Sequence, residues 1–229
     1  MKPIYEPKGA AKEYGDLALN IYTGCPHRCY YCFAPQVLHR DKEQFHSIVE
    51  PRANIVEETL KQLEREDFRG KTIHLCFTCD PYPTGYDTTP TREIIKLLKA
   101  HGAHVQILTK GDGSRDFDLL DGEDWYGVTL DGMGKFPEIG LDGLYKAKER
   151  GIKTWISFEP VCDARNVLAL LLLVGQSKIA DRVKIGKLNY HPSDIDWKKF
   201  GREAEALCQR LGLGYYIKDS LRREMENGE

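Results

Sequence analysis

Residues 17–32 read LALNIYTGCPHRCYYC, an apolar run followed at once by three cysteines in a C-x3-C-x2-C spacing. The apolar run is typical of a buried β-strand, and Gly24 and Pro26 permit a tight turn directly after it. In proteins built from alternating strands and helices, the chemistry lies on loops that follow the carboxyl ends of strands. The stretch therefore predicts a strand over 17–22 and a functional loop behind it.

The rest of the chain repeats this alternation of strand and helix patterns. Further strands are predicted over 72–78, 105–109, 126–130, 154–158, 182–188 and 213–217. Amphipathic helical patterns lie between them, the clearest running from Trp197 to Leu211. Such alternation needs a largely parallel sheet with right-handed crossovers, either an open doubly wound sheet or a full or partial barrel. No linker interrupts the pattern, which predicts a single domain over residues 1–229.

Composition narrows the class of protein. Of the 229 residues, 41% are hydrophobic and 30% charged, which suits a packed domain. The net charge of -2 gives the protein no overall positive potential, which weighs mildly against sequence-independent binding of nucleic acid. It does not exclude a local basic groove. The N-terminus lacks the apolar segment of a signal peptide, and the apolar run Val167–Val174 is too short to span a bilayer. We expect a cytoplasmic protein without membrane contact.

The cysteine loop has two chemical interpretations. In a cytoplasmic chain disulfides are rare, so closely spaced cysteines favour metal or catalytic roles. Three thiolates that bind a four-iron cluster leave one iron open for a substrate or cofactor, whereas electron-transfer clusters take four cysteines. The spacing alone also permits a single zinc ion with His27 or His39 as fourth ligand. A zinc-stabilised binding module without chemistry is therefore a second hypothesis.

Residues 24–32, Gly-Cys-Pro-His-Arg-Cys-Tyr-Tyr-Cys, resemble the cluster signature of the radical S-adenosylmethionine superfamily, including an aromatic residue, Tyr31, before the third cysteine. Members of this superfamily are typically full or partial (β/α) barrels with the motif after the first strand. The resemblance implies an α/β fold of the partial TIM-type, (β/α)6-like kind. It also implies a 4Fe–4S cluster on Cys25, Cys29 and Cys32.

The same resemblance implies an activity and its partners. The cofactor would be S-adenosylmethionine, cleaved reductively to a 5′-deoxyadenosyl radical that abstracts hydrogen from an unidentified substrate. An electron donor such as flavodoxin or ferredoxin would reduce the cluster.

The ends of later strands resemble the branch of the superfamily that contains spore photoproduct lyase. By position, Asp80 would face the ammonium group of the cofactor's methionyl end and Lys110 its carboxylate, while Cys79 takes the place of a hydroxyl residue. Thr129 or Asp131, at the end of the 126–130 strand, would bind the ribose. The plainer alternatives are turns at Asp80 and Asp131 and a solvated Lys110.

Departures from that branch limit the inference about the substrate. By this resemblance, the lyase has a tyrosine where this chain has Phe33. It has its hydrogen-donor cysteine where this chain has Phe77, and Cys76 lies one residue from that position. Three cysteines at strand ends are candidates for hydrogen donation, a thiyl radical or a second metal: Cys76, Cys79 and Cys162. Repair of a DNA lesion, with nucleic acid as the substrate, stays an alternative function.

Overall fold

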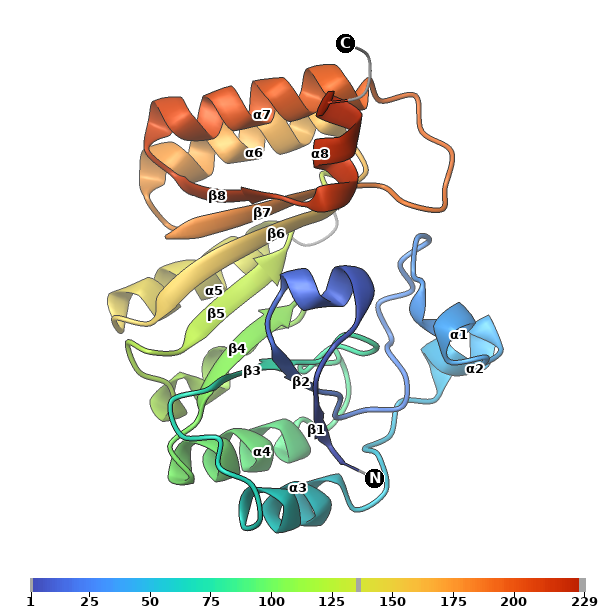
Figure 1. Ribbon diagram of the computed structural model, residues 1–229, viewed down its shortest axis with the longest axis vertical. Coiled ribbons are helices and arrows are strands. Elements are labelled where there is room, and N and C mark those ends of the chain that lie inside the picture. The colour runs from blue at the N-terminus through green and yellow to red at the C-terminus, as the bar shows by residue number, and fades with distance from the viewer. Residues whose placement is uncertain (1, 135–136, 227–229) are drawn as a thin grey trace. The chain divides into compact units, whose positions relative to one another are not determined.

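The structure is a computed structural model that describes residues 2–134 and 137–226 (Figure 1). The chain divides into two compact units, Met1–Trp125 and Tyr126–Glu229. The elements of the first unit are β1 (Ile4–Tyr5), the 3-10 helix η1 (Gly9–Glu13), β2 (Leu17–Leu19), α1 (Ala34–Val37), α2 (Lys42–Ser47), α3 (Ile55–Leu63), β3 (Thr72–Leu75), α4 (Thr89–Ala100), β4 (His104–Thr109) and the 3-10 helix η2 (Ser114–Leu119).

In the first unit, the strands lie in the sheet in chain order, β1-β2-β3-β4. β1 is antiparallel to β2, and the pairs β2–β3 and β3–β4 are parallel. The register sets Leu17 opposite Ile73 and Ile73 opposite Val105, and the buried side chains of β3 and β4 form part of the core. The helices α3 and α4 pack against each other (Figure 1). This parallel arrangement brings the ends of β2, β3 and β4 to one edge.

The second unit continues the alternation. Its elements are β5 (Trp125–Thr129, which begins at the last residue of the first unit), α5 (Pro137–Glu149), β6 (Lys153–Val161), α6 (Ala164–Ser177), β7 (Arg182–Lys187), α7 (Trp197–Leu211), β8 (Gly214–Ile217) and α8 (Asp219–Glu226). The strands again follow chain order, and β6, β7 and β8 pair in parallel. The helices α6 and α7 lie side by side over these strands (Figure 1). As the sequence pattern predicts, α7 runs from Trp197 to Leu211.

The first two parallel strands are shorter than the apolar patterns indicate. β2 ends at Leu19 instead of residue 22, and β3 ends at Leu75 instead of residue 78. The side chain of Asn20 accepts hydrogen bonds from the backbone N–H groups of Phe77 (2.7 Å) and Thr78 (3.0 Å). These bonds replace ladder pairing, and Cys76 adopts a φ of 70° that no strand allows. The predicted strands over 17–22 and 72–78 are therefore wrong at their ends, because a side chain there takes the place of the sheet's backbone partner.

No helix among the described residues is long and apolar enough to cross a membrane. The cytoplasmic location stays a prediction.

Candidate cluster and cofactor site

The cysteine loop is held against α2 by its backbone. The N–H of Cys25 donates to the carbonyl of Phe45 (3.1 Å), and Nδ1 of the buried His46 lies 2.8 Å from the carbonyl oxygen of Cys25. A Cβ atom at Gly24 would stand 2.3 Å from the carbonyl oxygen of Ile48 and 2.4 Å from that of Phe45. Only glycine fits this close approach of two backbone segments.

A surface ion pair fastens the middle of the loop. Arg28, between the first two cysteines, has a φ of 49° and forms a bidentate pair with Glu43 of α2, with N–O distances of 2.6 and 2.8 Å. Hydrogen bonding from Arg28, supported by Ser47, lowers the pKa of Glu43 to about 2. The backbone N–H of Cys32 donates to the carbonyl of Cys29 (3.1 Å), which closes the last turn of the loop.

The three cysteines lie on one short loop, and all three are free thiols that are partly exposed. Three thiolates can each bind a separate iron of a cluster and leave the fourth iron open, so this donor set fits a 4Fe–4S cluster.

Burial is the main cause of the pKa shifts of two of these thiols, Cys25 and Cys32. It raises the pKa of Cys25, and the nearby carboxylate of Asp80 raises it further. Burial also raises the pKa of Cys32.

Asp80, directly after the turn that follows β3, is a buried hub of hydrogen bonds. Its Oδ1 accepts from the hydroxyl of Thr109 (2.5 Å) and the N–H of Tyr82 (2.8 Å). Its Oδ2 accepts from the N–H of Lys110 (2.8 Å) and lies 3.4 Å from Nδ1 of His27. The turn expected at Asp80 is present, but the carboxylate also joins the ends of β3 and β4 to the cysteine loop.

His27 and Lys110 complete the connection between the strand ends and the cysteine loop. Nδ1 of His27 lies 3.6 Å from Sγ of Cys25, and its Nε2 lies 3.3 Å from the hydroxyl of Thr84. Burial lowers the pKa of His27. The ammonium of Lys110 donates to the hydroxyl of Tyr31 (2.6 Å) and lies 5.2 Å from the centre of its ring. The structure thus brings together the predicted residues Tyr31, Asp80 and Lys110 beside the cysteine loop.

The loop after Asp80 is held in place at both ends by hydrogen bonds. Tyr82 is buried and donates to Oδ2 of Asp116 (3.1 Å), which is itself paired with Arg92 (2.8 Å). Tyr86, which is partly exposed, donates to the carbonyl of Ser47 (3.2 Å).

Three of the predicted residues lie in the second unit. Thr129 ends β5, and Asp131 follows it and caps a turn by accepting the N–H of Met133 (2.9 Å). Cys162 follows β6, and its N–H donates to the carbonyl of Asp131 (2.8 Å), so these two residues are neighbours. Their proposed roles toward the ribose and the substrate remain predictions.

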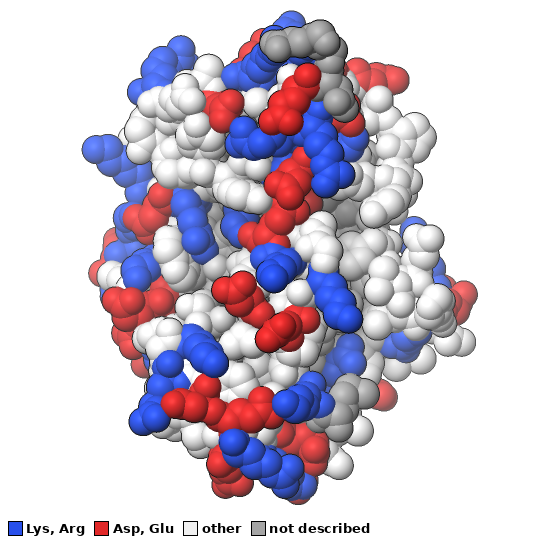
Figure 2. Space-filling view, in the orientation of Figure 1, with Lys and Arg blue, Asp and Glu red and all other residues white. Residues whose placement is uncertain are grey.

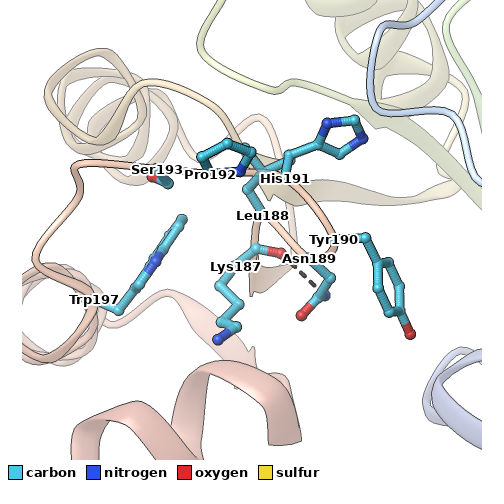
Figure 3. Close-up of a pocket in the computed structure, with 8 residues that line it drawn as sticks. All are labelled: Lys187, Leu188, Asn189, Tyr190, His191, Pro192, Ser193 and Trp197. Carbon is cyan, nitrogen blue, oxygen red and sulfur yellow. Dashed lines mark hydrogen bonds between the residues drawn. The ribbon is translucent and has the colours of Figure 1, made fainter.

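A second feature of this unit is the loop after β7. It lines a hollow of about 510 Å³ together with Trp197 (Figure 3). Tyr190 is 94% exposed there and has a φ of 64°. Two ion pairs of this unit also involve residues of β6 and β7: Glu159 pairs with Lys218 (2.7 Å) and Lys187 with Glu224.

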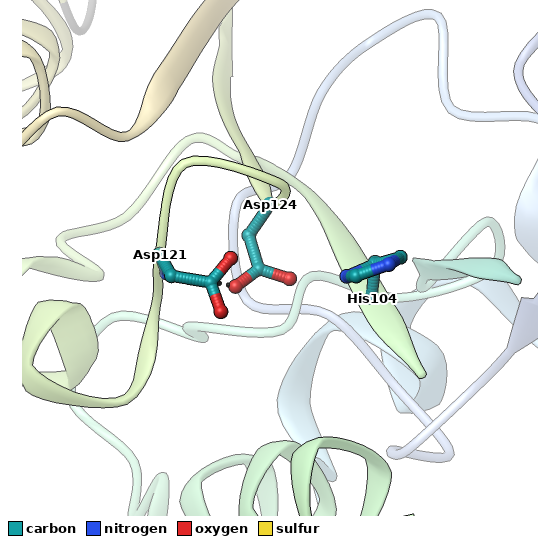
Figure 4. A group of neighbouring side chains, drawn as sticks. All are labelled: His104, Asp121 and Asp124. Carbon is teal, nitrogen blue, oxygen red and sulfur yellow. Dashed lines mark hydrogen bonds between the residues drawn. The ribbon is translucent and has the colours of Figure 1, made fainter. Parts of the chain in front are cut away.

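His104, Asp121 and Asp124 in the first unit lie close enough together to suggest a metal site (Figure 4), but a lysine side chain already pairs with the two carboxylates. The ammonium of Lys99 lies 2.8 Å from a carboxylate oxygen of Asp121 and 2.6 Å from one of Asp124. Asp124 also accepts the N–H of Val105 (2.8 Å), so its role is to hold β4 and the following loop together.

The comparisons with known proteins identify the family. The sequence model of the Radical SAM superfamily matches residues 19–162, which is more than half of the chain. The chain therefore belongs to the radical S-adenosylmethionine superfamily.

Two curated relatives are uncharacterized proteins. ORF301 of Acidianus two-tailed virus is 26% identical over 183 residues, which is 68% of this chain and 60% of that protein. Rv2578c of Mycobacterium tuberculosis (strain ATCC 25618 / H37Rv) is 35% identical over 100 residues, which is 41% of this chain and 29% of that protein. The chain thus spans less than two thirds of the length of each.

Solved structures of spore photoproduct lyase share the fold. The lyase complexed with dinucleoside spore photoproduct matches with a TM-score of 0.69 at 12% identity, covering 93% of this chain and 78% of the lyase. A mutant lyase with bound AdoMet and the same dinucleoside also gives 0.69, at 13% identity and the same coverage. The predicted α/β fold, a partial TIM-type barrel, is confirmed.

The sequence does not predict two contacts of this site. His27 is predicted only as a zinc ligand, although it contacts both Cys25 and Asp80. Thr109 is the first residue of the Thr-Lys pair that the family resemblance places at the cofactor, but the resemblance does not predict its hydrogen bond to Asp80. His27 and Asp80 are 53 positions apart, so their contact leaves no local pattern in the sequence.

Proposed function

We propose that this protein is a radical S-adenosylmethionine enzyme in which Cys25, Cys29 and Cys32 hold a 4Fe–4S cluster. Membership of the superfamily and three free thiols on one loop support this. When bound, the cluster and S-adenosylmethionine supply reductive carbon–sulfur cleavage, which yields a 5′-deoxyadenosyl radical for hydrogen abstraction. An electron donor of the flavodoxin or ferredoxin kind is part of the proposal, because the cleavage consumes one electron.

The observation that carries the proposal is the cluster of charged groups beside the cysteine loop. A methionyl group is a zwitterion, and Asp80 and Lys110 offer an anion and a cation next to each other at adjacent strand ends. Three short hydrogen bonds fix the carboxylate of Asp80, while its contact to His27 is longer, at 3.4 Å. A carboxylate has about four acceptor positions. The ammonium group would therefore take or share the position that faces His27.

Lys110 would bind the cofactor's carboxylate through its ammonium group, which donates a hydrogen bond to Tyr31 in this structure. The hydroxyl of Tyr31 accepts from Lys110 and keeps this long side chain on the side of the cysteine loop. We propose that the cofactor's carboxylate replaces or joins this hydroxyl as an acceptor. Cys79, Thr129 and Asp131 are proposed as further cofactor contacts, by the family resemblance alone.

The test of the proposed function is cofactor cleavage by anaerobically reconstituted protein. With excess dithionite, the wild-type chain should form 5′-deoxyadenosine and methionine in equal amounts, and Cys29→Ala should form neither. Lys110→Met should raise the Kd for S-adenosylmethionine by at least about tenfold, the equivalent of one charge-assisted hydrogen bond. The matched control Lys96→Met removes an exposed lysine on α4 and should leave this Kd unchanged. A colourless protein with one zinc ion and no cleavage would establish the binding-module alternative instead.

A second candidate function is repair of a nucleic-acid lesion. It is favoured by the shared fold with a lyase that was solved with a dinucleoside substrate. Two features weigh against it: Phe33 has no phenol, and the face seen in Figure 2 mixes acidic and basic side chains without a broad basic patch. The test is whether DNA or RNA binds with a salt-dependent affinity and alters the cleavage rate. No effect at low salt would remove this candidate.

A further inference from the structure

The turn after β3 carries two cysteines, Cys76 and Cys79, in a C-x-x-C spacing. In an extended strand, residues three apart lie about 10 Å from each other on opposite faces. Here β3 ends at Leu75, and the φ of 70° at Cys76 turns the chain. The two cysteines are therefore joined by a turn and not by an extended strand, and their thiols interact with each other.

The two sulfurs have different surroundings. Cys76 is only 5% exposed, whereas Cys79 is partly open to solvent. The sulfur of Cys79 accepts the backbone N–H of Tyr22 (3.4 Å). Arg52 is also close, since its Nε donates to the carbonyl of Tyr22 (3.2 Å) and its guanidinium lies 3.5 Å from the hydroxyl of Thr78.

These surroundings favour a thiolate on one member of the pair. Burial raises the pKa of Cys79, but the hydrogen bonds from Cys76 and Tyr22 and the charge of Arg52 outweigh it, so the pKa is lowered. Burial raises the pKa of Cys76, and its interaction with Cys79 adds to this. A thiolate on the less buried cysteine next to a buried thiol is the arrangement of a nucleophilic and a resolving cysteine.

We propose that Cys76 and Cys79 are a redox-active dithiol that closes reversibly to a disulfide by exchange with a small-molecule disulfide. The thiolate of Cys79 attacks one sulfur of the small molecule, forms a mixed disulfide and releases a thiolate. Cys76 then gives its proton to the released thiolate and attacks the sulfur of Cys79, which expels a second thiolate. The cysteine pair loses two electrons, and the small-molecule disulfide gains them as two thiol groups.

Disulfide formation here requires neither the cluster nor S-adenosylmethionine, so its outcome is independent of the proposed function. It would give the site a two-electron couple one residue away from Asp80.

The test is peptide mapping after anaerobic treatment of the reconstituted protein with excess oxidised glutathione, followed by acid quenching and alkylation. Trypsin releases residues 72–92, which contain Cys76 and Cys79 and no other cysteine. It releases residues 154–165 with Cys162 alone, a partly exposed cysteine that serves as the matched control. The cluster cysteines fall in other peptides.

The expected result is an unalkylated 72–92 peptide, lighter than the reduced peptide by two hydrogens, that dithiothreitol converts back. Its yield should exceed that of the Cys162 mixed disulfide by at least about tenfold at early times, since the second exchange step is intramolecular. In Cys76→Ser, a glutathione adduct on Cys79 should persist, and in Cys79→Ser the buried Cys76 should stay reduced. A 72–92 peptide that stays reduced while Cys162 is modified would overturn the proposal. So would equal reactivity of the two single variants.

Discussion

Replacing Asp80 with asparagine changes one buried oxygen into an amide group without changing the size of the side chain. In the wild-type chain, each carboxylate oxygen accepts at least one short hydrogen bond: Oδ1 from Thr109 and Tyr82, Oδ2 from Lys110. An asparagine can keep only one oxygen. Its NH2 group must then face an N–H or hydroxyl donor, whichever way the amide is turned.

The magnitude follows from these contacts. The arrangement that costs least keeps the oxygen toward Thr109 and Tyr82 and loses the bond from the N–H of Lys110. A hydrogen bond to a charged group contributes about 1.5–3 kcal/mol, and a donor left without a partner costs about 1–3 kcal/mol. Because these terms overlap, we expect Asp80→Asn to destabilise the first unit by about 3 kcal/mol. That is a fall in Tm of roughly 6–12 °C for a chain of this length.

The assay is thermal unfolding of the reconstituted protein, followed by circular dichroism with and without S-adenosylmethionine. The variant should melt at a lower temperature, and the cofactor should raise its Tm much less than that of the wild-type protein. The matched control is Asp112→Asn, since Asp112 accepts one N–H in an exposed turn (2.9 Å to Ser114) and should change Tm little. If Asp80→Asn melts within about 2 °C of the wild-type protein, the assigned hydrogen-bond hub is wrong.

Three further substitutions test other parts of the structure. Gly24→Ala should leave the cysteine loop unable to seat against two backbone carbonyls, so the iron content after reconstitution should fall by more than half; full iron content would contradict this. Lys218→Met should lower the free energy of unfolding by about 3–5 kcal/mol in denaturant titrations, because the substitution removes the ion pair that the 2%-exposed Lys218 forms with Glu159. Burial raises the pKa of Asp181, but the hydrogen bond from Lys148 outweighs it, so the folded pKa lies below the unfolded value of about 3.9. Its contribution to stability is present above pH 4 and lost as the pH falls through the folded pKa, so Asp181→Asn should lose less stability than the wild-type protein between pH 4 and 2. Equal acid sensitivity of the two proteins would refute this.

The elements with long periodic patterns could be predicted from the sequence, because burial of one face determines them. The helix from Trp197 to Leu211 begins at a cap, where Asp196 accepts the N–H of Lys199, and ends at Gly212 with a φ of 62°. The antiparallel strand β1 could not be predicted, because Ile4 and Tyr5 alone form no pattern. Its partner Gln62, which bonds the backbone of Ile4 at both N–H and carbonyl, lies 58 residues away.

The site residues that belong to the family motif or end a predicted strand could be predicted from the sequence. The residues whose position depends on a turn could not. The cysteines and the positions of Asp80 and Lys110 came from the motif and from strand ends. The turn at Cys76 did not, because it depends on the side chain of Asn20, which occupies the backbone donors that a longer strand would have used. Alternation along a strand therefore gave no guide to which of Cys76 and Cys79 faces the site, since β3 has already ended there.

The most direct test of the open-iron cluster is electron paramagnetic resonance of the dithionite-reduced, reconstituted protein before and after addition of S-adenosylmethionine. We predict the signal of one reduced 4Fe–4S cluster per chain, a clear change in its g-values when the cofactor binds, and a weaker change in Lys110→Met at the same cofactor concentration. A signal that the cofactor leaves unaltered, or a protein that takes up zinc and no iron, would contradict the assignment of Cys25, Cys29 and Cys32 as ligands of a cluster that binds the cofactor.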